Sequence, residues 1–303
     1  MKGLGVGLAL GGGAARGLAH IGVLRGLMGA GIPISHLAGS SFGSVVAASY
    51  ACGTLSELEG LLCTLTYRDL VRFADVAFSG GVLRGDVLLA ELRTLTRDLD
   101  FEGLSVPLAV VATDLNTGTR KILRSGSVAE AVRASMSVPG LFAPVNMGDD
   151  VLGDGGLIEM LPVPTLRELG AGLVVGVDVS STSDIWTRAA TRARRSVGKM
   201  RQVVRRFNGP VTKPRPEPDN QGWGFFHTVL TAFDITETRL RQKCHQDQAS
   251  ILIRPKVGHV QGHQFYRAAE IISAGREAIE PVIPSLLSAL EREYPVHRLR
   301  GTA

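Results

Sequence analysis

One serine lies in a setting that suits nucleophilic catalysis. Residues 39–43 read Gly-Ser-Ser-Phe-Gly and fit the pattern G-x-S-x-G, with Ser41 at the centre. The segment falls between a predicted strand and a predicted helix, where Gly39 and Gly43 would permit the sharp turn that projects a serine hydroxyl beneath a helix N-terminus. The pattern makes Ser41 a candidate nucleophile, although a glycine-rich turn used only for packing fits the same five residues.

A second glycine-rich turn precedes the first. Residues 11–17 read Gly-Gly-Gly-Ala-Ala-Arg-Gly after an apolar segment. Three successive glycines at a strand-to-helix junction expose backbone N–H groups, which can stabilise a developing oxyanion. Two nucleotide-binding alternatives fit less well. The phosphate-loop pattern with its lysine is absent, and Arg16 stands where a dinucleotide turn needs its third glycine.

Asp154-Gly155-Gly156 is a third turn, and an aspartate followed by two glycines usually has only a turn-forming role. In combination, however, the three turns resemble the patatin-like phospholipase family, in which a glycine-rich oxyanion loop, a G-x-S-x-G elbow and a D-G-[GA] motif follow in this order. Three further segments resemble that family's motifs, and its bacterial single-domain members are the most similar. These segments are residues 20–24 (HIGVL), 111–115 (VATDL) and 134–140 (ASMSVPG).

The resemblance covers residues 4 to about 180 well and 225–290 more loosely, and it implies a two-residue dyad. Asp154 would accept the proton of Ser41, and Ser41 would attack an ester carbonyl to form an acyl-enzyme. The oxyanion donors would come from the first loop, with Gly12 and Gly13 favoured. The wider set of implied site residues is Gly11 and Ala14 in that loop, with Arg16, Gly39, Gly43, Gly155 and Gly156 in supporting positions; Arg16 would bond to nearby carbonyls.

A catalytic histidine is the main alternative to the dyad. The seven histidines have no recognisable triad context, and His20, the one nearest to a glycine turn, suits helix packing better. An ordinary α/β-hydrolase also places its elbow after several strands, whereas residues 39–43 follow a single strand–helix unit. No ligand cluster indicates a metal, and no cofactor is implied.

Apolar strands alternate with helices along the chain, which predicts an α/β fold with a mainly parallel sheet and helices on both faces. The family resemblance implies a three-layer arrangement within a single domain spanning 1–303, including a C-terminal helix and tail at 281–303. The predicted strands are 4–10, 34–37, 108–113, 173–179 and 251–254; the predicted helices are 15–29, 43–50, 83–98, 128–137, 264–279 and 281–293.

The net charge of +5 is unevenly distributed. Ten basic residues and no acidic one fall between 185 and 216, so the rest of the chain is net negative. Apolar residues recur at helical spacing over 185–207, which predicts a basic amphipathic insert at 184–221 with no clear family counterpart. It is either a solvated surface helix or a segment that contacts an anionic membrane through Arg188, Arg192, Arg195 and Arg205. Nucleic-acid binding is disfavoured because no aromatic platform accompanies the arginines.

The predicted activity is hydrolysis of lipid acyl esters, with phospholipids or lysophospholipids as substrates. The alternative is a lipid-binding regulatory protein of the same fold with negligible turnover. Three widely spaced cysteines match neither a disulfide framework nor a zinc site, which favours a reducing, cytoplasmic location with possible peripheral membrane contact. No segment has the length and apolarity of a membrane span.

Overall fold

A computed structural model describes residues 5–64, 83–180 and 249–293 of the 303-residue chain. Eight strands of this described part form one mixed sheet in the order β5-β6-β3-β2-β1-β7-β8, with β4 also paired to β3. Strands β8, β7, β1, β2 and β3 are parallel, whereas β4 and β6 run antiparallel to β3. The strands are β1 (Val6–Leu10), β2 (Ile34–Ser40), β3 (Leu108–Asp114), β4 (Thr119–Leu123), β5 (Val145–Met147), β6 (Asp150–Asp154), β7 (Leu173–Val177) and β8 (Ile251–Ile253).

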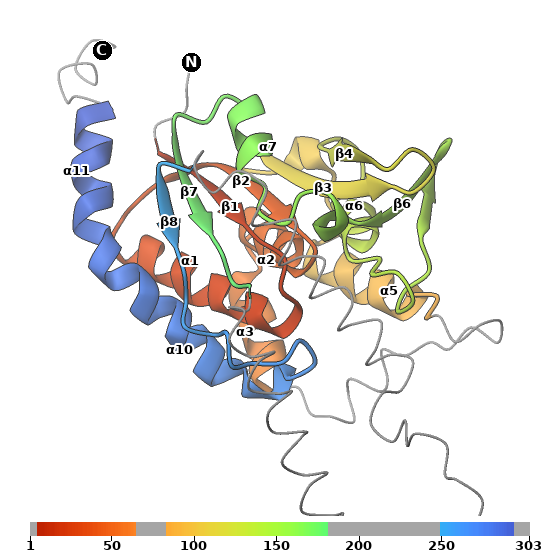
Figure 1. Cartoon of the computed structure of the whole chain (residues 1–303), viewed down its shortest axis with the longest axis horizontal. Helices are drawn as coiled ribbons and strands as arrows, with labels where there is room; N and C mark the ends of the chain where they lie inside the picture. Colours follow the sequence, from red (N-terminus) through yellow and green to blue (C-terminus); the bar gives the residue numbers. More distant parts are fainter. Residues whose placement is uncertain (1–4, 65–82, 181–248, 294–303) are drawn as a thin grey trace, which may run out of the picture.

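Helices lie on both faces of this sheet, as Figure 1 shows. Helices α1 and α10 pack along each other on one face, and α7 packs against β1, β2 and β7 on the other. The predicted α/β class with a mainly parallel sheet is therefore confirmed. The helices are α1 (Ala19–Gly29), α2 (Phe42–Ala51), α3 (Leu55–Thr64), α5 (Asp86–Leu95), α6 (Val128–Ser135), α7 (Val163–Glu168), α10 (Ala268–Ile279) and α11 (Ile283–Glu293).

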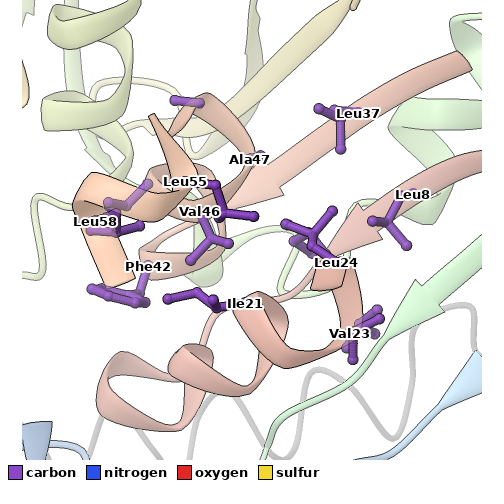
Figure 2. Close-up of a cluster of buried hydrophobic side chains, with 14 of the residues drawn as sticks. Leu8, Ile21, Val23, Leu24, Leu37, Phe42, Val46, Ala47, Leu55 and Leu58 are labelled. Atoms are coloured by element: carbon purple, nitrogen blue, oxygen red, sulfur yellow. The ribbon is translucent and has the colours of Figure 1, made fainter. Parts of the chain in front are cut away.

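The larger hydrophobic core lies between the sheet and helices α1, α2 and α3. Alternate residues of a strand point to opposite faces, so Leu8 joins this core while its neighbour Ala9 packs in the smaller cluster beneath α7. Figure 2 shows Leu8 and Leu37 of the strands on the same side as Leu24 of α1 and Val46 of α2. All of these side chains are fully buried, and each contributes about 1.5–3 kcal/mol to the hydrophobic driving force.

Two glycines allow α10 to approach α1 closely. A Cβ atom at Gly22 would lie 1.9 Å from the carbonyl oxygen of Ile272, and one at Gly275 would lie 1.9 Å from the carbonyl oxygen of Ala19. Because both obstacles are backbone atoms, neither could move away from a larger side chain. This close packing fixes α10 against α1, the helix that follows the first glycine-rich turn.

The observed elements differ from the predicted ones in several places. The helix predicted over 83–98 is limited to α5, and Arg97 and Asp98 beyond it have the positive φ angles 53° and 51°. Helices α3 and α7 and the antiparallel strands β4, β5 and β6 were not predicted. The predicted insert at 184–221 and the tail beyond residue 293 lie outside the described residues. No helix in the described ranges has both the length and the apolarity needed to span a bilayer.

Candidate active site

Ser41 occupies a tight turn between β2 and α2. Strand β2 ends at Ser40, α2 begins at Phe42, and Ser41 between them has φ 50° and ψ −131°. A positive φ is uncommon for a residue other than glycine and costs about 1–3 kcal/mol. A Cβ atom at Gly43 would lie 2.2 Å from the carbonyl oxygen of Leu10, so only glycine fits there. The turn thus has the form that the G-x-S-x-G pattern predicts.

The Ser41 hydroxyl donates a hydrogen bond to the carboxylate of Asp154. The distance from Ser41 Oγ to Asp154 Oδ2 is 2.7 Å. Sheet register explains the meeting, because Ser40 of β2 pairs with Val111 of β3, and the next residue of β3, Ala112, pairs with Asp154 of β6. A single strand, β3, therefore separates the serine from the aspartate, and the two residues approach each other across Val111 and Ala112 of that strand.

Asp154 is fully buried and firmly held. Its other carboxylate oxygen, Oδ1, accepts a hydrogen bond of 2.7 Å from the amide of Gly156, and its carbonyl oxygen accepts one of 2.8 Å from Thr113 Oγ1. Burial raises the pKa of Asp154 to about 7, because removal from water disfavours the charged form, and the hydrogen bonds from Ser41 and Gly156 oppose this effect only in part. A carboxyl group with such a pKa can accept and return a proton near neutral pH.

The glycine-rich turn lies beside Ser41, and its amides are not equivalent. A Cβ atom at Gly12 would lie 3.2 Å from Ser41 Cβ, which places this loop against the serine. The amide of Gly11 donates to Val177 O and that of Gly12 to Met160 O, at 3.2 and 3.0 Å. By contrast, the amides of Gly13 and Ala14 have no hydrogen-bond partner within the described parts of the chain. Gly12 was one of the two favoured donors, but its N–H is already occupied.

The side chains of His20 and Arg16 hold the glycine-rich segment in place through hydrogen bonds to backbone carbonyls. His20 is fully buried, and its Nε2 lies 2.7 Å from the carbonyl oxygen of Gly11. Because a carbonyl can only accept, Nε2 carries the proton. Burial lowers the pKa of His20 to about 4, so the ring is neutral at physiological pH. Buried Arg16 donates to the carbonyl oxygen of Val260 at 3.4 Å. Both side chains therefore bond to backbone carbonyls.

The structure also reveals contacts that sequence reasoning missed. The amide of Ser41 donates to Ser135 Oγ at 2.9 Å, and the amide of Asp154 donates to the carbonyl oxygen of Ser137 at 3.0 Å. Both serines belong to the segment 134–140, which resembles a family motif but for which the sequence predicts no role. The hydroxyl of Ser135 could have been noted as a polar group in this segment, but nothing in the sequence indicated its partner, and the contact of Ser137 uses a backbone carbonyl that any residue would supply.

These groups form a constellation suited to acyl transfer. A hydroxyl is hydrogen-bonded to a carboxylate whose pKa lies near neutrality, and the adjoining loop contains two amides with no hydrogen-bond partner among the described residues. The side chain that accepts the hydrogen bond of the Ser41 hydroxyl is Asp154, whereas His20 bonds to the carbonyl oxygen of Gly11. Within residues 5–64, 83–180 and 249–293, no group of three or more His, Cys, Asp or Glu side chains is placed to hold a metal ion.

Comparison with protein families and known proteins gives a consistent result. The family model described as patatin-like phospholipase matches residues 8–167. An uncharacterized NTE family protein of Mycobacterium tuberculosis is 30% identical over 320 residues, covering 89% of each chain. The match to human patatin-like phospholipase domain-containing protein 6 is 34% identical over 197 residues, but it covers 59% of this chain and only 14% of the human protein.

A second comparison concerns a solved structure. The crystal structure of VipD from Legionella pneumophila superposes with a TM-score of 0.56, covering 93% of this chain and 67% of that one. The sequence identity is 16%, so this likeness concerns the fold.

A protein named lysophospholipase NTE1, from Mycosarcoma maydis, is 31% identical over 202 residues, which are 62% of this chain and 10% of the fungal protein.

Proposed function

The chain belongs to the patatin-like phospholipase family, and from this premise we propose that it is a serine hydrolase that cleaves the acyl esters of phospholipids or lysophospholipids. The observation that carries the proposal is the 2.7 Å hydrogen bond from Ser41 Oγ to Asp154 Oδ2. Names of relatives support the substrate class, since they include patatin-like phospholipase and lysophospholipase.

In the first half of the proposed reaction, Ser41 Oγ attacks the ester carbonyl carbon while its proton passes to Asp154 Oδ2. The tetrahedral intermediate then collapses, and the leaving alcohol takes the proton from Asp154 as the acyl-enzyme forms. In the second half, water attacks the acyl carbon and gives a proton to Asp154. Release of the carboxylic acid returns that proton to Ser41 Oγ and restores the enzyme.

The negative charge on the intermediate needs preorganised donors. We assign this role to the amides of Gly13 and Ala14, because those of Gly11 and Gly12 are occupied by Val177 O and Met160 O. Amides that are already oriented do not have to reorganise as charge develops, and the loss of one oxyanion donor typically costs about 10²–10³-fold in kcat.

The proposal is tested by hydrolysis of a chromogenic acyl ester and by release of fatty acid from phospholipid and lysophospholipid vesicles. Ser41→Ala should abolish both activities and leave the fold intact. Ser40→Ala is a matched control, because Ser40 is the adjacent buried serine and its hydroxyl has no partner among the described residues. A Ser41→Ala protein with wild-type turnover would overturn the mechanism. Lipid binding without turnover by the wild type would favour the regulatory alternative.

A peripheral membrane contact is a separate part of the proposal. The ten basic residues between 185 and 216, with no acidic residue among them, support binding to anionic lipid. Each basic residue near such a surface contributes about 1 kcal/mol. Replacing Arg188, Arg192, Arg195 and Arg205 by Gln should therefore reduce co-sedimentation with vesicles that contain phosphatidylserine. Unchanged sedimentation of that variant would remove this part of the proposal.

A further inference from the structure

We propose that Ser135 is a positioning residue, which holds the backbone of Ser41 in the conformation that aims its hydroxyl at Asp154. This inference rests on the proposed hydrolase function and adds a residue to its machinery. Ser135 is the last residue of α6 and is fully buried, and its hydroxyl lies between Ser41 and β3.

The directions of the two hydrogen bonds at Ser135 are fixed by chemistry. Ser135 Oγ lies 2.6 Å from the carbonyl oxygen of Val111, which can only accept, so the hydroxyl proton is committed to that bond. The Ser41 amide, 2.9 Å away, can only donate, so it takes a lone pair of the same oxygen. The resulting chain runs from Ser41 N–H through the Ser135 hydroxyl to Val111 C=O.

This chain acts at a strained position. With φ 50°, Ser41 has a conformation that persists only where its surroundings determine it. Ser135 holds the N–H on one side of the residue. On the other side, the amide and hydroxyl of Ser44 both donate to the Ser41 carbonyl oxygen, at 2.9 and 2.6 Å. Of these two supports, only Ser135 ties the turn to a different part of the fold.

The same short segment also contacts the backbone of the base. Two residues beyond Ser135, the carbonyl oxygen of Ser137 accepts the amide of Asp154 at 3.0 Å. One segment therefore bonds to the main chain of both Ser41 and Asp154. Because this segment accepts hydrogen bonds from the backbone amides of both Ser41 and Asp154, its position sets the distance between their side chains.

The hydrogen bond from Ser41 N–H to Ser135 also bears on which amides can stabilise the oxyanion. The Ser41 amide is occupied by Ser135 and cannot also donate to the substrate. The assignment of this task to the loop that contains Gly13 and Ala14 agrees with that arrangement.

The test compares Ser135→Ala with Ser49→Ala. Ser49 is also fully buried, and its hydroxyl donates to the carbonyl oxygen of Val45 at 2.8 Å, but it receives no amide of the dyad. The readouts are kcat and KM for ester hydrolysis, the second-order rate of labelling by a fluorophosphonate, the pH–rate profile and the melting temperature.

We expect Ser135→Ala to lower kcat and the labelling rate about 10–100-fold with KM within about 3-fold, which is the pattern of a lost transition-state interaction. A weaker Ser41–Asp154 bond should also raise the apparent pKa in the rate profile, because that bond lowers the pKa of Asp154. Ser49→Ala should retain wild-type kinetics with a similar loss of melting temperature.

Wild-type labelling and pH dependence in Ser135→Ala would overturn the inference. So would an equal loss of rate in Ser49→Ala, since the effect would then be general destabilisation. If Ser135→Ala does not fold, Ser135→Cys decides the matter, because a thiol fills the space but accepts weakly, and wild-type rates in that variant would refute the role. A wild-type enzyme that does not react with the probe would instead refute the proposed function.

Discussion

The hydroxyl of Ser41 lies 2.7 Å from a carboxylate oxygen of Asp154, although 113 residues separate them in the sequence. A hydroxyl and a carboxylate at this distance can exchange a proton directly. Asp154 is fully buried, and burial raises its pKa to about 7. The short distance between Ser41 and Asp154 and the raised pKa of Asp154 lead to predictions that can be tested.

The first prediction concerns the pH dependence of catalysis. Asp154 can accept a proton only when it is ionised, so kcat/KM should rise with pH through an apparent pKa of about 7 and reach a plateau above it. At pH 6 the rate should be about one tenth of the plateau. A stopped-assay profile of ester hydrolysis from pH 5 to 9 measures this limb, and a flat profile over that range would show that the carboxyl group titrates elsewhere.

The second prediction concerns stability. Because the pKa of Asp154 is raised from 3.8 to about 7 on folding, the native state binds the proton more tightly than the unfolded state. This group therefore stabilises the fold below about pH 4, loses its contribution as pH rises to about 7, and adds no further dependence above that. In Asp154→Asn this fall in the free energy of unfolding should be absent. Urea titrations of both proteins at pH 5 and pH 8 make the comparison, and identical pH dependence would contradict it.

The third prediction concerns the glycine-rich loop. A Cβ atom at Gly12 would lie 2.6 Å from Met160 Sδ and 3.2 Å from Ser41 Cβ, so Gly12→Ala should displace the loop from the serine. Since preorganised donors lose effect when they move, we expect kcat to fall about 10²-fold. Gly29→Ala is the control, because nothing lies within 4 Å of its Cβ position. Equal ester hydrolysis by the two variants would show that the loop tolerates a side chain.

The fourth prediction separates support from catalysis at His20. Its Nε2 bonds to the carbonyl oxygen of Gly11, not to the dyad, and its pKa of about 4 is too low for it to produce a rate limb near pH 7. His20→Leu leaves a buried carbonyl without its partner, which costs about 1–3 kcal/mol of stability. We expect a lower melting temperature, a loss of kcat within about 10-fold and an unchanged apparent pKa. Disappearance of the acidic limb in this variant would instead identify His20 as the base.

Much of the fold could be predicted from the sequence. Buried parallel strands appear as continuous apolar runs, and the amphipathic helices between them have a clear period. The antiparallel strands β4, β5 and β6 gave no such signal, because polar residues interrupt their apolar positions: Thr119, Arg120 and Lys121 lie on β4, Asn146 on β5, and Asp150 and Asp154 on β6. Strand β6 carries Asp154, so the element that positions the proposed base was harder to predict than the turn that contains Ser41.

The candidate site, like the fold, has some features that the sequence predicts and others that it does not. Ser41, Asp154 and the glycine-rich loop have local patterns that can be read as motifs. Two hydrogen bonds of the site join residues that are far apart in the sequence, so no local pattern predicts them. They run from Gly12 N–H to Met160 O and from Ser41 N–H to Ser135 Oγ. The sequence therefore predicts that this loop supplies oxyanion donors, and the structure shows that the amides of Gly13 and Ala14 have no hydrogen-bond partner among the described residues.

The rate at which a fluorophosphonate modifies Ser41 tests the dyad most directly. The wild type should form a single adduct on the peptide that contains Ser41, and Asp154→Asn should react about 10²–10⁴-fold more slowly, because it has lost the base that activates the hydroxyl. Asp149→Asn, at an exposed carboxylate nearby in the sequence, should react at the wild-type rate. An Asp154→Asn protein that is modified as fast as the wild type, or an adduct on a residue other than Ser41, would contradict direct activation of Ser41 by Asp154.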